Sequence, residues 1–267
     1  MTVTGYICEI FSSYQGEGGS VPGSLMGRRQ VFVRFAGCNL ADPDTGTGGC
    51  RFCDSPGARS MSVDHARLEL SPGGRVFEDA KNPVSVDLVM GRIGSLRTPD
   101  LHSVSLTGGE PLGQSGFLDS ILGAARKMDL KTYLETNGSL PGNLRELDNL
   151  PDYACVDVKD RSAGATSDWE MLLEREFESI GILKNSGVTA FSKMVVTEET
   201  DPGDVEMISE RLSSLGCGLA IQPVTPARGV LPPGIDRLGE ITRAAAKHLL
   251  PGKISLSVQM HKTLGMM

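Results

Sequence analysis

Three cysteines near the N-terminus have the residue type and the spacing that most strongly indicate chemistry. Eleven residues separate Cys38 from Cys50, and two separate Cys50 from Cys53. Three thiolates can bind three irons of a [4Fe–4S] cluster and leave the fourth iron open to a small molecule. Zinc is the alternative, because it accepts three cysteines and a histidine, although the nearest histidine in sequence, His65, would be a weak fourth ligand. Spacing alone leaves both metals open.

A disulfide framework does not fit this chain. Six cysteines are spread over 267 residues, and the N-terminus lacks the pattern of a signal peptide. The remaining cysteines lie in apolar, strand-like runs, where a free thiol behaves as a small buried hydrophobe. We therefore expect Cys8, Cys155 and Cys217 to be structural.

The composition points to a small-molecule substrate. Apolar residues make up 39% and charged residues 22% of the chain, and no apolar run approaches the length of about 20 residues that spans a bilayer. The net charge of −7 disfavours a nucleic-acid-binding surface. We expect an intracellular, cytoplasmic protein with neither nucleic acid nor membrane as a partner.

The elements that must position these cysteines alternate along the chain. Strands are predicted from β-branched, aromatic and leucine-rich runs at 3–12, 31–36, 103–107, 131–136, 153–158, 191–197, 217–222 and 254–259. Helices are predicted from apolar residues at three-to-four spacing at 85–97, 116–129, 168–185, 203–215 and 235–249. Repeated strand and helix units predict a parallel sheet. Residues 56–83 fit no such unit and are predicted to be a surface insertion or lid in one domain spanning 1–267.

Polar motifs follow six of the predicted strands at the same point. They are Cys38, Thr107–Pro111, Glu135–Gly138, Asp157–Asp160, Gln222–Thr225 and Gln259–Lys262. Each motif has an ordinary structural explanation when taken alone: a glycine turn, a solvated carboxylate, or an ion pair. Because the carboxyl ends of parallel strands meet at one rim, the motifs converge with the cysteines, which favours a functional site.

The cysteines combined with Thr107-Gly108-Gly109-Glu110-Pro111 resemble the radical S-adenosylmethionine (SAM) enzymes. This resemblance implies an α/β fold, a partial, open TIM-like (β/α)6 barrel with parallel strands, and a [4Fe–4S] cluster whose open iron binds SAM. Gly109 and Glu110 would bind the amino group of SAM. The usual spacing in that superfamily is C-x₃-C-x₂-C, so the cluster-binding loop at 38–53 is unusually long. A longer loop adds little closure entropy, so the spacing is compatible with ligation.

Further motifs narrow the resemblance to the 7-carboxy-7-deazaguanine synthase family, some of whose members have an expanded first cysteine gap. The motifs are Tyr14–Gly18, Arg34–Leu40, Cys50–Ser55, Glu135–Gly138 and Gln259–Gly265. The family converts 6-carboxy-5,6,7,8-tetrahydropterin to 7-carboxy-7-deazaguanine and ammonia, on the route to queuosine and archaeosine. By resemblance, reductive cleavage of SAM gives a radical that abstracts hydrogen from C6 of the pterin. Flavodoxin or ferredoxin as electron donor, Mg²⁺ as a further cofactor and a homodimer are also implied.

The family's substrate contacts transfer to Tyr14, Gln15, Gly16, Glu17, Arg34, Thr107 and the terminal carboxylate of Met267. A carboxylate such as that of Glu17 suits the donor edge of a 2-amino-4-oxo ring. The guanidinium fork of Arg34 suits the substrate carboxylate.

The family's SAM contacts transfer to Gly109, Glu110, Glu135, Thr136, Asn137, Lys159, Gln222, Pro223, Val224 and Thr225. Ser55 stands where the family has a threonine that contacts Mg²⁺, and its hydroxyl oxygen suits that hard cation. Two departures affect the transfer: Asp157-Val158-Lys159 replaces the serine-proline-lysine of many members, and the chain ends in methionine instead of proline.

Two other classes of protein remain as alternatives. A glycyl-radical-activating enzyme shares the cluster and the Gly-Gly-Glu-Pro motif, but it would not need Gln15–Gly18 or Arg34. A non-catalytic zinc-binding module would need only the cysteines and a fourth ligand.

Overall fold

The computed structural model describes residues 2–41 and 48–267. Its centre is a sheet of ten strands in the order β12-β11-β10-β9-β8-β7-β3-β2-β4-β5. Seven neighbouring strands are parallel, namely β3 (Arg29–Phe35), β7 (Leu101–Gly108), β8 (Thr132–Thr136), β9 (Tyr153–Asp157), β10 (Thr189–Val196), β11 (Leu219–Pro223) and β12 (Ile254–Leu256). The parallel sheet predicted from the alternating pattern is therefore present.

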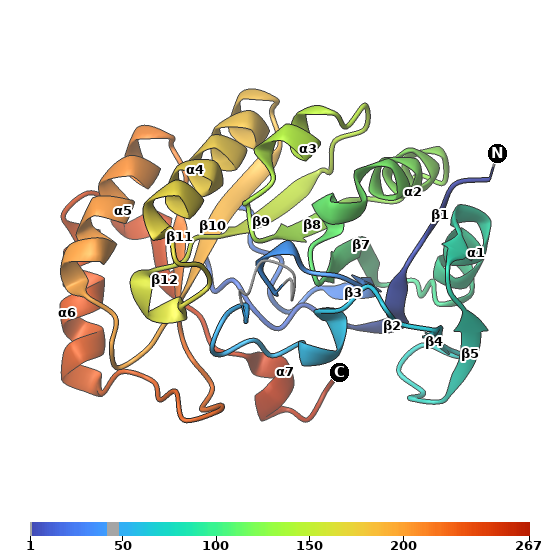
Figure 1. Cartoon of the computed structure of the whole chain (residues 1–267), viewed down its shortest axis with the longest axis horizontal. Coiled ribbons are helices and arrows are strands. Elements are labelled where there is room, and N and C mark those ends of the chain that lie inside the picture. The colour runs from blue at the N-terminus through green and yellow to red at the C-terminus, as the bar shows by residue number, and fades with distance from the viewer. Residues whose placement is uncertain (1, 42–47) are drawn as a thin grey trace.

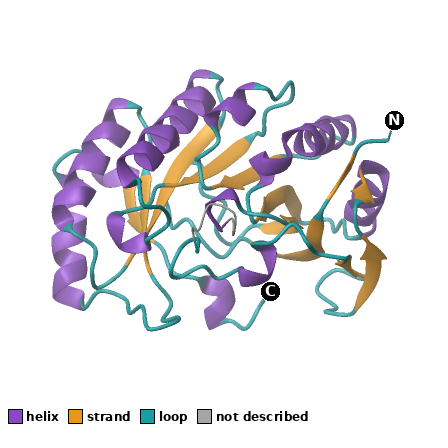
Figure 2. Ribbon diagram, viewed as in Figure 1, coloured by secondary structure: helices purple, strands orange, loops and turns teal. Residues whose placement is uncertain are grey.

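Six helices follow six of these strands in turn. They are α1 (Val86–Ser95), α2 (Ser115–Lys127), α3 (Pro141–Arg145), α4 (Trp169–Asn185), α5 (Pro202–Ser214) and α6 (Ile235–Ala246). The sheet curves, and the helices cover its outer side (Figures 1 and 2). The two outermost strands, β12 and β5, do not pair with each other in the described part of the chain. The predicted open (β/α)6 barrel is confirmed.

The helices bury the apolar faces that the three-to-four spacing in the sequence predicts. In α2, apolar side chains at three-to-four spacing are buried, namely Phe117, Leu118, Ile121, Leu122 and Ala125. They join the large hydrophobic core between the sheet and the helices. Side chains cap several helices: Ser85 accepts a hydrogen bond from the Leu88 amide, and Asp168 accepts one from the Met171 amide. These contacts fix the connections that lead from one strand end to the next.

The N-terminal part of the sheet differs from the prediction. β2 (Ile7–Tyr14) is antiparallel to β3, because the loop between them contains no crossover helix and the chain returns directly. Residues 56–83, predicted to be a surface insertion or lid, add β4 (His65–Glu69) and β5 (Phe77–Lys81) to the sheet beyond β2. Only Ala66 and Leu68 of this hairpin join the main core as buried residues, and β5 has no buried residue, so the hairpin lacks a strong hydrophobic pattern.

Smaller elements complete the chain. β1 (Thr4–Gly5) pairs with β6 (Val84–Ser85), and short 3₁₀ helices form at Asn39–Ala41, Pro56–Ala58, Pro111–Gln114, Arg161–Ala163 and Pro251–Lys253. The last predicted strand is shorter than expected, because β12 ends at Leu256 and Gln259 is already the N-cap residue of α7 (Met260–Thr263). No helix within residues 2–41 and 48–267 is long and apolar enough to cross a membrane.

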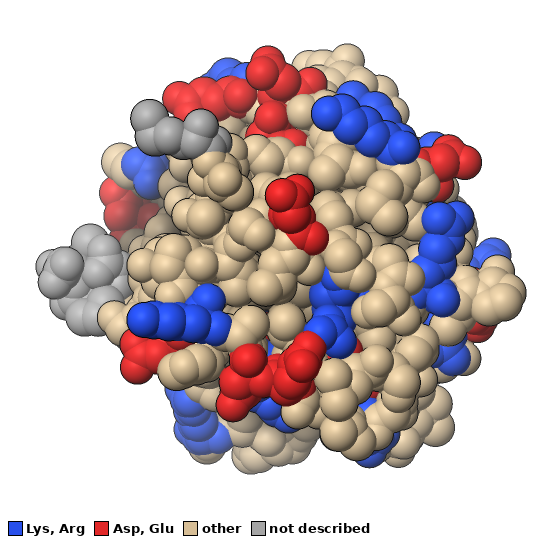
Figure 3. Space-filling view, turned by 90° about the vertical axis from the view of Figure 1, so that its right-hand side faces the viewer, with Lys and Arg blue, Asp and Glu red and all other residues tan. Residues whose placement is uncertain are grey.

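Charge is mixed on the face at the right-hand side of Figure 1. Basic and acidic side chains are scattered there among other residues and do not gather into one patch (Figure 3). This face therefore offers no extended basic surface for a polyanion, in agreement with the negative net charge of the chain.

Candidate active site

The carboxyl ends of the parallel strands surround a cavity of about 390 Å³. All but two of the predicted site residues line it: Tyr14, Gln15, Gly16, Glu17, Arg34, Cys38, Cys50, Cys53, Ser55, Thr107, Gly109, Glu135, Thr136, Asn137, Lys159, Gln222, Val224, Thr225 and Met267. Glu110 and Pro223 are not among the residues that line it. The tertiary structure therefore brings together residues from one end of the chain to the other.

Cys38, Cys50, Cys53, Leu40 and Phe52 form what we call the cysteine side of the cavity. All six cysteines of the chain are free thiols. Leu40 is buried in a small apolar cluster against which Cys38, Cys50 and Phe52 pack. Residues 42–47 of the predicted cluster-binding loop lie outside the described residues, so the structure places the two ends of that loop.

Backbone hydrogen bonds hold the cysteine side. The Cys53 amide donates to the Cys50 carbonyl at 3.1 Å, which gives the second cysteine pair a tight turn. The Cys38 amide donates to the Arg59 carbonyl at 2.9 Å, and the Arg51 amide donates to Ala163 at 3.0 Å. These hydrogen bonds fix the backbone at both ends of the loop and thereby position the thiols.

Burial raises the pKa of the Cys38 and Cys50 thiols. Lys159 opposes this shift at Cys50, and a backbone hydrogen bond from the Leu40 amide opposes it at Cys38. Without metal, these two side chains are therefore neutral thiols near pH 7. Binding of a metal or cluster must displace their protons, as is usual for thiolate ligands.

The Gly108–Gly109 turn provides close backbone packing. A Cβ atom on Gly109 would lie 2.1 Å from the Gly37 carbonyl oxygen. The next amide, that of Glu110, donates to the same oxygen at 2.7 Å. The motif after β7 is thereby tied to the residue that precedes Cys38, so the glycine is required by the approach of protein backbone at this point.

Glu110 is only 1% exposed, and it holds the neighbouring strand end. Its carboxylate accepts hydrogen bonds from the Leu112 amide, the Thr136 hydroxyl and the Asn137 amide. Burial raises the pKa of Glu110 to about 7, although the hydrogen bonds from Asn137, Leu112 and Thr136 oppose the shift. In this structure Glu110 positions Thr136 and Asn137, which do line the cavity.

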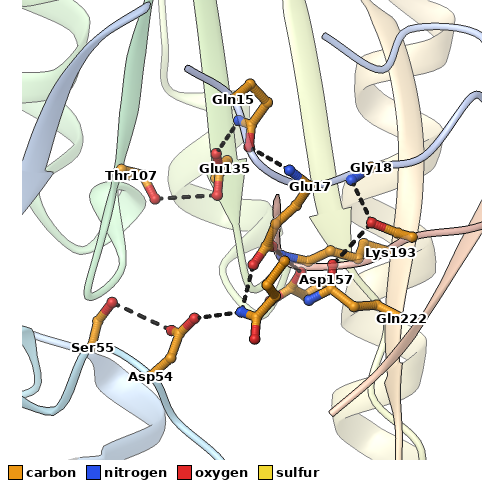
Figure 4. A network of polar contacts seen from close by, with 12 residues as sticks. Gln15, Glu17, Gly18, Asp54, Ser55, Thr107, Glu135, Asp157, Lys193 and Gln222 are labelled. Atoms are coloured by element: carbon orange, nitrogen blue, oxygen red, sulfur yellow. Dashed lines mark hydrogen bonds and ion pairs between the residues drawn. The ribbon is translucent and has the colours of Figure 1, made fainter. Parts of the chain in front are cut away.

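Glu17, Asp157, Lys159, Lys193 and Gln259 form the charged side of the cavity. The Lys193 ammonium contacts the Glu17 carboxylate and lies 3.4 Å from Asp157 Oδ1 (Figure 4). Lys159 Nζ lies 3.1 Å from Asp157 Oδ2. Sequence reasoning missed Lys193 entirely; the available signal was a lone lysine within the apolar run 191–196.

The buried charges support one another. Burial disfavours the charged form of Asp157, yet Lys159 and Lys193 outweigh it and hold the Asp157 pKa below its usual range. Burial likewise disfavours charged Lys193, but Asp157 and Glu17 raise the Lys193 pKa well above its ordinary value. Both lysines and Asp157 therefore stay charged near neutral pH.

Gln15, Glu135 and Thr107 form a second polar group beside the charged side. Gln15 Nε2 donates to Glu135 Oε1 at 2.7 Å, and the Thr107 hydroxyl donates to Glu135 Oε2 at 3.3 Å (Figure 4). Burial raises the pKa of Glu135, with Lys193 opposing. The loop after β2 is thus fixed to the ends of β7 and β8.

Arg34 and Ser55 meet at the rim near the cysteine side. Arg34 Nε pairs with Glu9 Oε1 at 2.8 Å, and its Nη1 donates to the Ser55 hydroxyl at 2.9 Å. The Ser55 hydroxyl also lies 3.4 Å from Asp54 Oδ1. The guanidinium is therefore oriented by two partners on the cavity wall.

The C-terminal segment forms another part of the wall. The Ser13 hydroxyl donates to a terminal oxygen of Met267 at 2.9 Å, and the Met266 amide donates to the His261 carbonyl. A Cβ atom on Gly16 would lie 2.3 Å from His261 Nδ1, so the glycine makes room for the imidazole.

Asp54, Gln259, His261 and Lys262 line the cavity, although the sequence analysis assigned them no role. Gln259 Nε2 donates to Glu17 Oε1 at 2.7 Å and to Asp54 Oδ2 at 2.9 Å. The available signal was that Asp54 belongs to the motif Cys50–Ser55, and the other three residues belong to the motif Gln259–Gly265. Glu17, Asp54 and His261 bring ligand atoms within 4.8 Å of one another. Gln259 already donates to both carboxylates, and they also pair with lysines: Glu17 with Lys193 and Asp54 with Lys262.

Comparison with known proteins identifies the family. Residues 33–212 match the model of the radical SAM superfamily. The chain is 42% identical to a 7-carboxy-7-deazaguanine synthase of Thermococcus kodakarensis, over 98% of both chains. It is 36% identical to that of Methanothermobacter thermautotrophicus over 97% of both, and 35% identical to that of Geobacter sulfurreducens over 96% of both. The chain belongs to the 7-carboxy-7-deazaguanine synthase family of radical SAM proteins.

A solved structure supports the fold of this family member. A radical SAM methyltransferase from Sphaerobacter thermophilus aligns with a TM-score of 0.57 and 14% identity, covering 87% of this chain and 70% of the other. Membership of the superfamily brings a [4Fe–4S] cluster and SAM as cofactors. The donor set fits a cluster: three free thiols face one cavity, and Asn137 Nδ2 lies 3.9 Å from Cys38 Sγ. The zinc-module alternative is therefore not retained.

Proposed function

We propose that the chain is a 7-carboxy-7-deazaguanine synthase, which converts 6-carboxy-5,6,7,8-tetrahydropterin to 7-carboxy-7-deazaguanine and ammonia. The observation that carries this proposal is that Glu17 and Arg34 line the same cavity as the three cysteines. A glycyl-radical-activating enzyme would need neither residue. Full-length relatives of the same name support the proposal.

Cys38, Cys50 and Cys53 would hold the cluster, and the strand ends beside them would hold SAM. When bound, the two cofactors supply the radical that removes hydrogen from C6 of the pterin. We assign SAM contacts to Gly109, Glu135–Asn137, Lys159 and 222–225. Glu110 contributes indirectly, because its hydrogen bonds fix Thr136 and Asn137.

The charged side would bind the pterin ring. The Glu17 carboxylate accepts from N–H groups, and the ring presents such donors on its amino edge. Glu17 is oriented by Lys193 and Gln259, so little side-chain freedom remains to be lost on binding. Tyr14, Gln15, Gly16 and Thr107 would complete this part of the site.

The carboxylate of the substrate would pair with Arg34. Its guanidinium is held by Glu9 and Ser55, which pre-organises it for a bidentate contact. The Met267 carboxylate would contact the substrate from the C-terminal wall. Since any residue supplies a terminal carboxylate, methionine can replace the proline of related chains.

Magnesium, the electron donor and the oligomer stay predictions. Ser55 remains the expected Mg²⁺ contact, because its hydroxyl oxygen lies beside Asp54 at the cavity wall. Flavodoxin or ferredoxin would supply the electron, and two copies of the chain would form a homodimer.

Product formation tests the proposal directly. The full chain is purified and reconstituted without oxygen, then incubated with SAM, a reductant and the carboxy-tetrahydropterin, with and without Mg²⁺. We expect 7-carboxy-7-deazaguanine and an equal amount of ammonia, formed faster with Mg²⁺. No product from a protein that retains its cluster would reject the proposed activity, and equal rates in both arms would reject the Mg²⁺ role.

A further inference from the structure

Four charged side chains of alternating sign cross the cavity wall in a row. Lys159 contacts Asp157, Asp157 contacts Lys193, and Lys193 contacts Glu17. We call these residues the charge row. Three of the side chains are nearly buried, with exposed fractions of 8% for Lys159, 10% for Lys193 and 13% for Glu17. Solvent therefore screens these contacts much less than it screens surface pairs.

The two ends of the charge row belong to different parts of the proposed site. Lys159 lies among the SAM contacts, and Glu17 lies among the pterin contacts. Asp157 and Lys193 connect them and are register partners on the paired strands β9 and β10. Because both residues are on rigid strands, the connection between the two binding regions is built into the sheet.

We propose that Asp157 is a positioning residue that couples SAM binding to pterin binding through Lys159 and Lys193. This inference rests on the proposed function. It assigns a role to the carboxylate that stands where many related chains have serine.

The direction of the coupling follows from the order of the charges. An anionic group of SAM that engages Lys159 weakens the hold of Lys159 on Asp157. Asp157 then interacts more strongly with Lys193, and the ion pair between Lys193 and Glu17 becomes weaker as a result. Glu17 becomes a better acceptor for the donor edge of the pterin, so each ligand should increase affinity for the other, as linkage requires.

Other charged or polar groups around the row are accounted for. Gln259 donates to the second Glu17 oxygen, Glu135 is engaged by Gln15 and Thr107, and the Lys159 amide donates to Glu176. Asp157 is the one residue among these that contacts both lysines through side-chain ion pairs. Removing its charge should disconnect the two ends.

The chain carries its own optical probe for this change. Trp169 is the single tryptophan, it is 7% exposed, and its indole Nε1 donates to the Lys159 carbonyl at 2.7 Å. A shift in the position of Lys159 should therefore alter the emission of Trp169. This readout requires neither turnover nor a reductant.

The test measures binding of the carboxy-tetrahydropterin to the reconstituted full chain, with and without saturating SAM and without reductant. In the wild-type protein SAM should lower the pterin Kd by about 5- to 150-fold, the usual range of coupling between sites. In Asp157→Asn the ratio should fall to within about twofold of one, since the isosteric amide lacks the charge that links the lysines. Pterin alone should change Trp169 emission in the wild type but not in this variant.

Matched variants separate coupling from general damage. Glu206→Gln removes a carboxylate from the Lys247 pair on the outer helices and should keep the wild-type ratio. Asp157→Glu keeps the charge and should restore most of the coupling. Lys193→Gln removes the ion pairs of Lys193 with Asp157 and Glu17, so it should abolish coupling as Asp157→Asn does. The test therefore stays decisive if the asparagine variant does not fold.

The outcomes distinguish this inference from the proposed function. If Asp157→Asn or a folded Lys193→Gln weakens both ligands but leaves the effect of SAM on the pterin Kd unchanged, the residues are merely structural and the inference is overturned. Absence of coupling in the wild type would also overturn it. If wild-type protein with its cluster and SAM binds no pterin, the proposed function fails instead.

Discussion

The two sides of the cavity are built in different ways. On the cysteine side, backbone hydrogen bonds and a small apolar cluster hold a loop that supplies the thiols. On the charged side, ion pairs and side-chain hydrogen bonds connect Glu17, Asp157, Lys193 and Gln259, which come from four separate segments. Metal ligands need the right atoms within reach of one another, whereas recognition of an organic ring needs side chains fixed in direction.

This difference predicts different responses to substitution. A ligand on the cysteine side should act in an all-or-none manner, because a cluster with one missing thiolate is not retained. A residue elsewhere on the cavity wall that contacts the substrate should change affinity by a limited factor, because its neighbours still hold part of the ligand. The predictions below test this contrast, from the largest expected effect to the smallest.

Cys50→Ala should abolish the cluster and the activity. The reconstituted wild type should contain about four irons per chain and absorb broadly near 400 nm, as expected for one thiolate-bound cluster, and the variant should lose both signals. Cys155→Ala is the matched control, since this cysteine is buried in β9 away from the cavity lining. Equal iron contents in the two variants would reject the ligand assignment.

Glu110→Gln should change the pH dependence of the free energy of unfolding. Folding raises the Glu110 pKa from 4.5 to about 7, so the protonated acid is favoured in the native state. Its stabilising contribution is full below pH 4.5 and is lost as the pH rises through about 7. The loss is about 3 kcal/mol for a shift of this size.

The glutamine variant carries no titrating proton at this position. Its free energy of unfolding relative to wild type should therefore improve by about 3 kcal/mol between pH 4.5 and pH 8. Urea unfolding of both cluster-free proteins at several pH values measures this difference. Two parallel curves would show that Glu110 ionises normally in the folded state.

Arg34→Lys should raise the substrate KM by about 10- to 100-fold, which corresponds to the loss of a charge-assisted hydrogen bond. The affinity for SAM should be nearly unchanged, because Arg34 is assigned to the substrate carboxylate. Arg67→Lys is the control: Arg67 faces the same Glu9 carboxylate at 3.8 Å but does not line the cavity. A shift in SAM affinity as large as the shift in KM would contradict the assignment.

Deletion of Met267 should raise the substrate KM by about fivefold, the effect of one weakened polar contact of about 1 kcal/mol. The terminal carboxylate would then lie one residue away from its position beside Ser13. Met267→Ala keeps that carboxylate in place and should behave like the wild type. A loss of similar size in the alanine variant would assign the role to the methionine side chain.

The helical half of the fold could be predicted from the sequence because local patterns determine it. Apolar residues in 116–129 recur at helical spacing, and the short buried runs between helices require a parallel sheet. The β4 and β5 hairpin could not be predicted, because β5 is an exposed edge strand and β4 buries only two apolar residues, so neither strand needs a continuous apolar pattern. The antiparallel direction of β2 was also missed, since composition does not set strand direction.

By itself the sequence determined which atoms could do chemistry: the thiols of Cys38, Cys50 and Cys53, the Gly-Gly-Glu-Pro turn and the Gln15–Gly18 motif. Residue type and short spacing are local properties, so they are present before folding. Only the tertiary structure decided that Lys193 lies between Glu17 and Asp157, and that Glu110 faces Thr136 and Asn137. These contacts join residues far apart in the chain, and the pairing and packing of the strands bring them together.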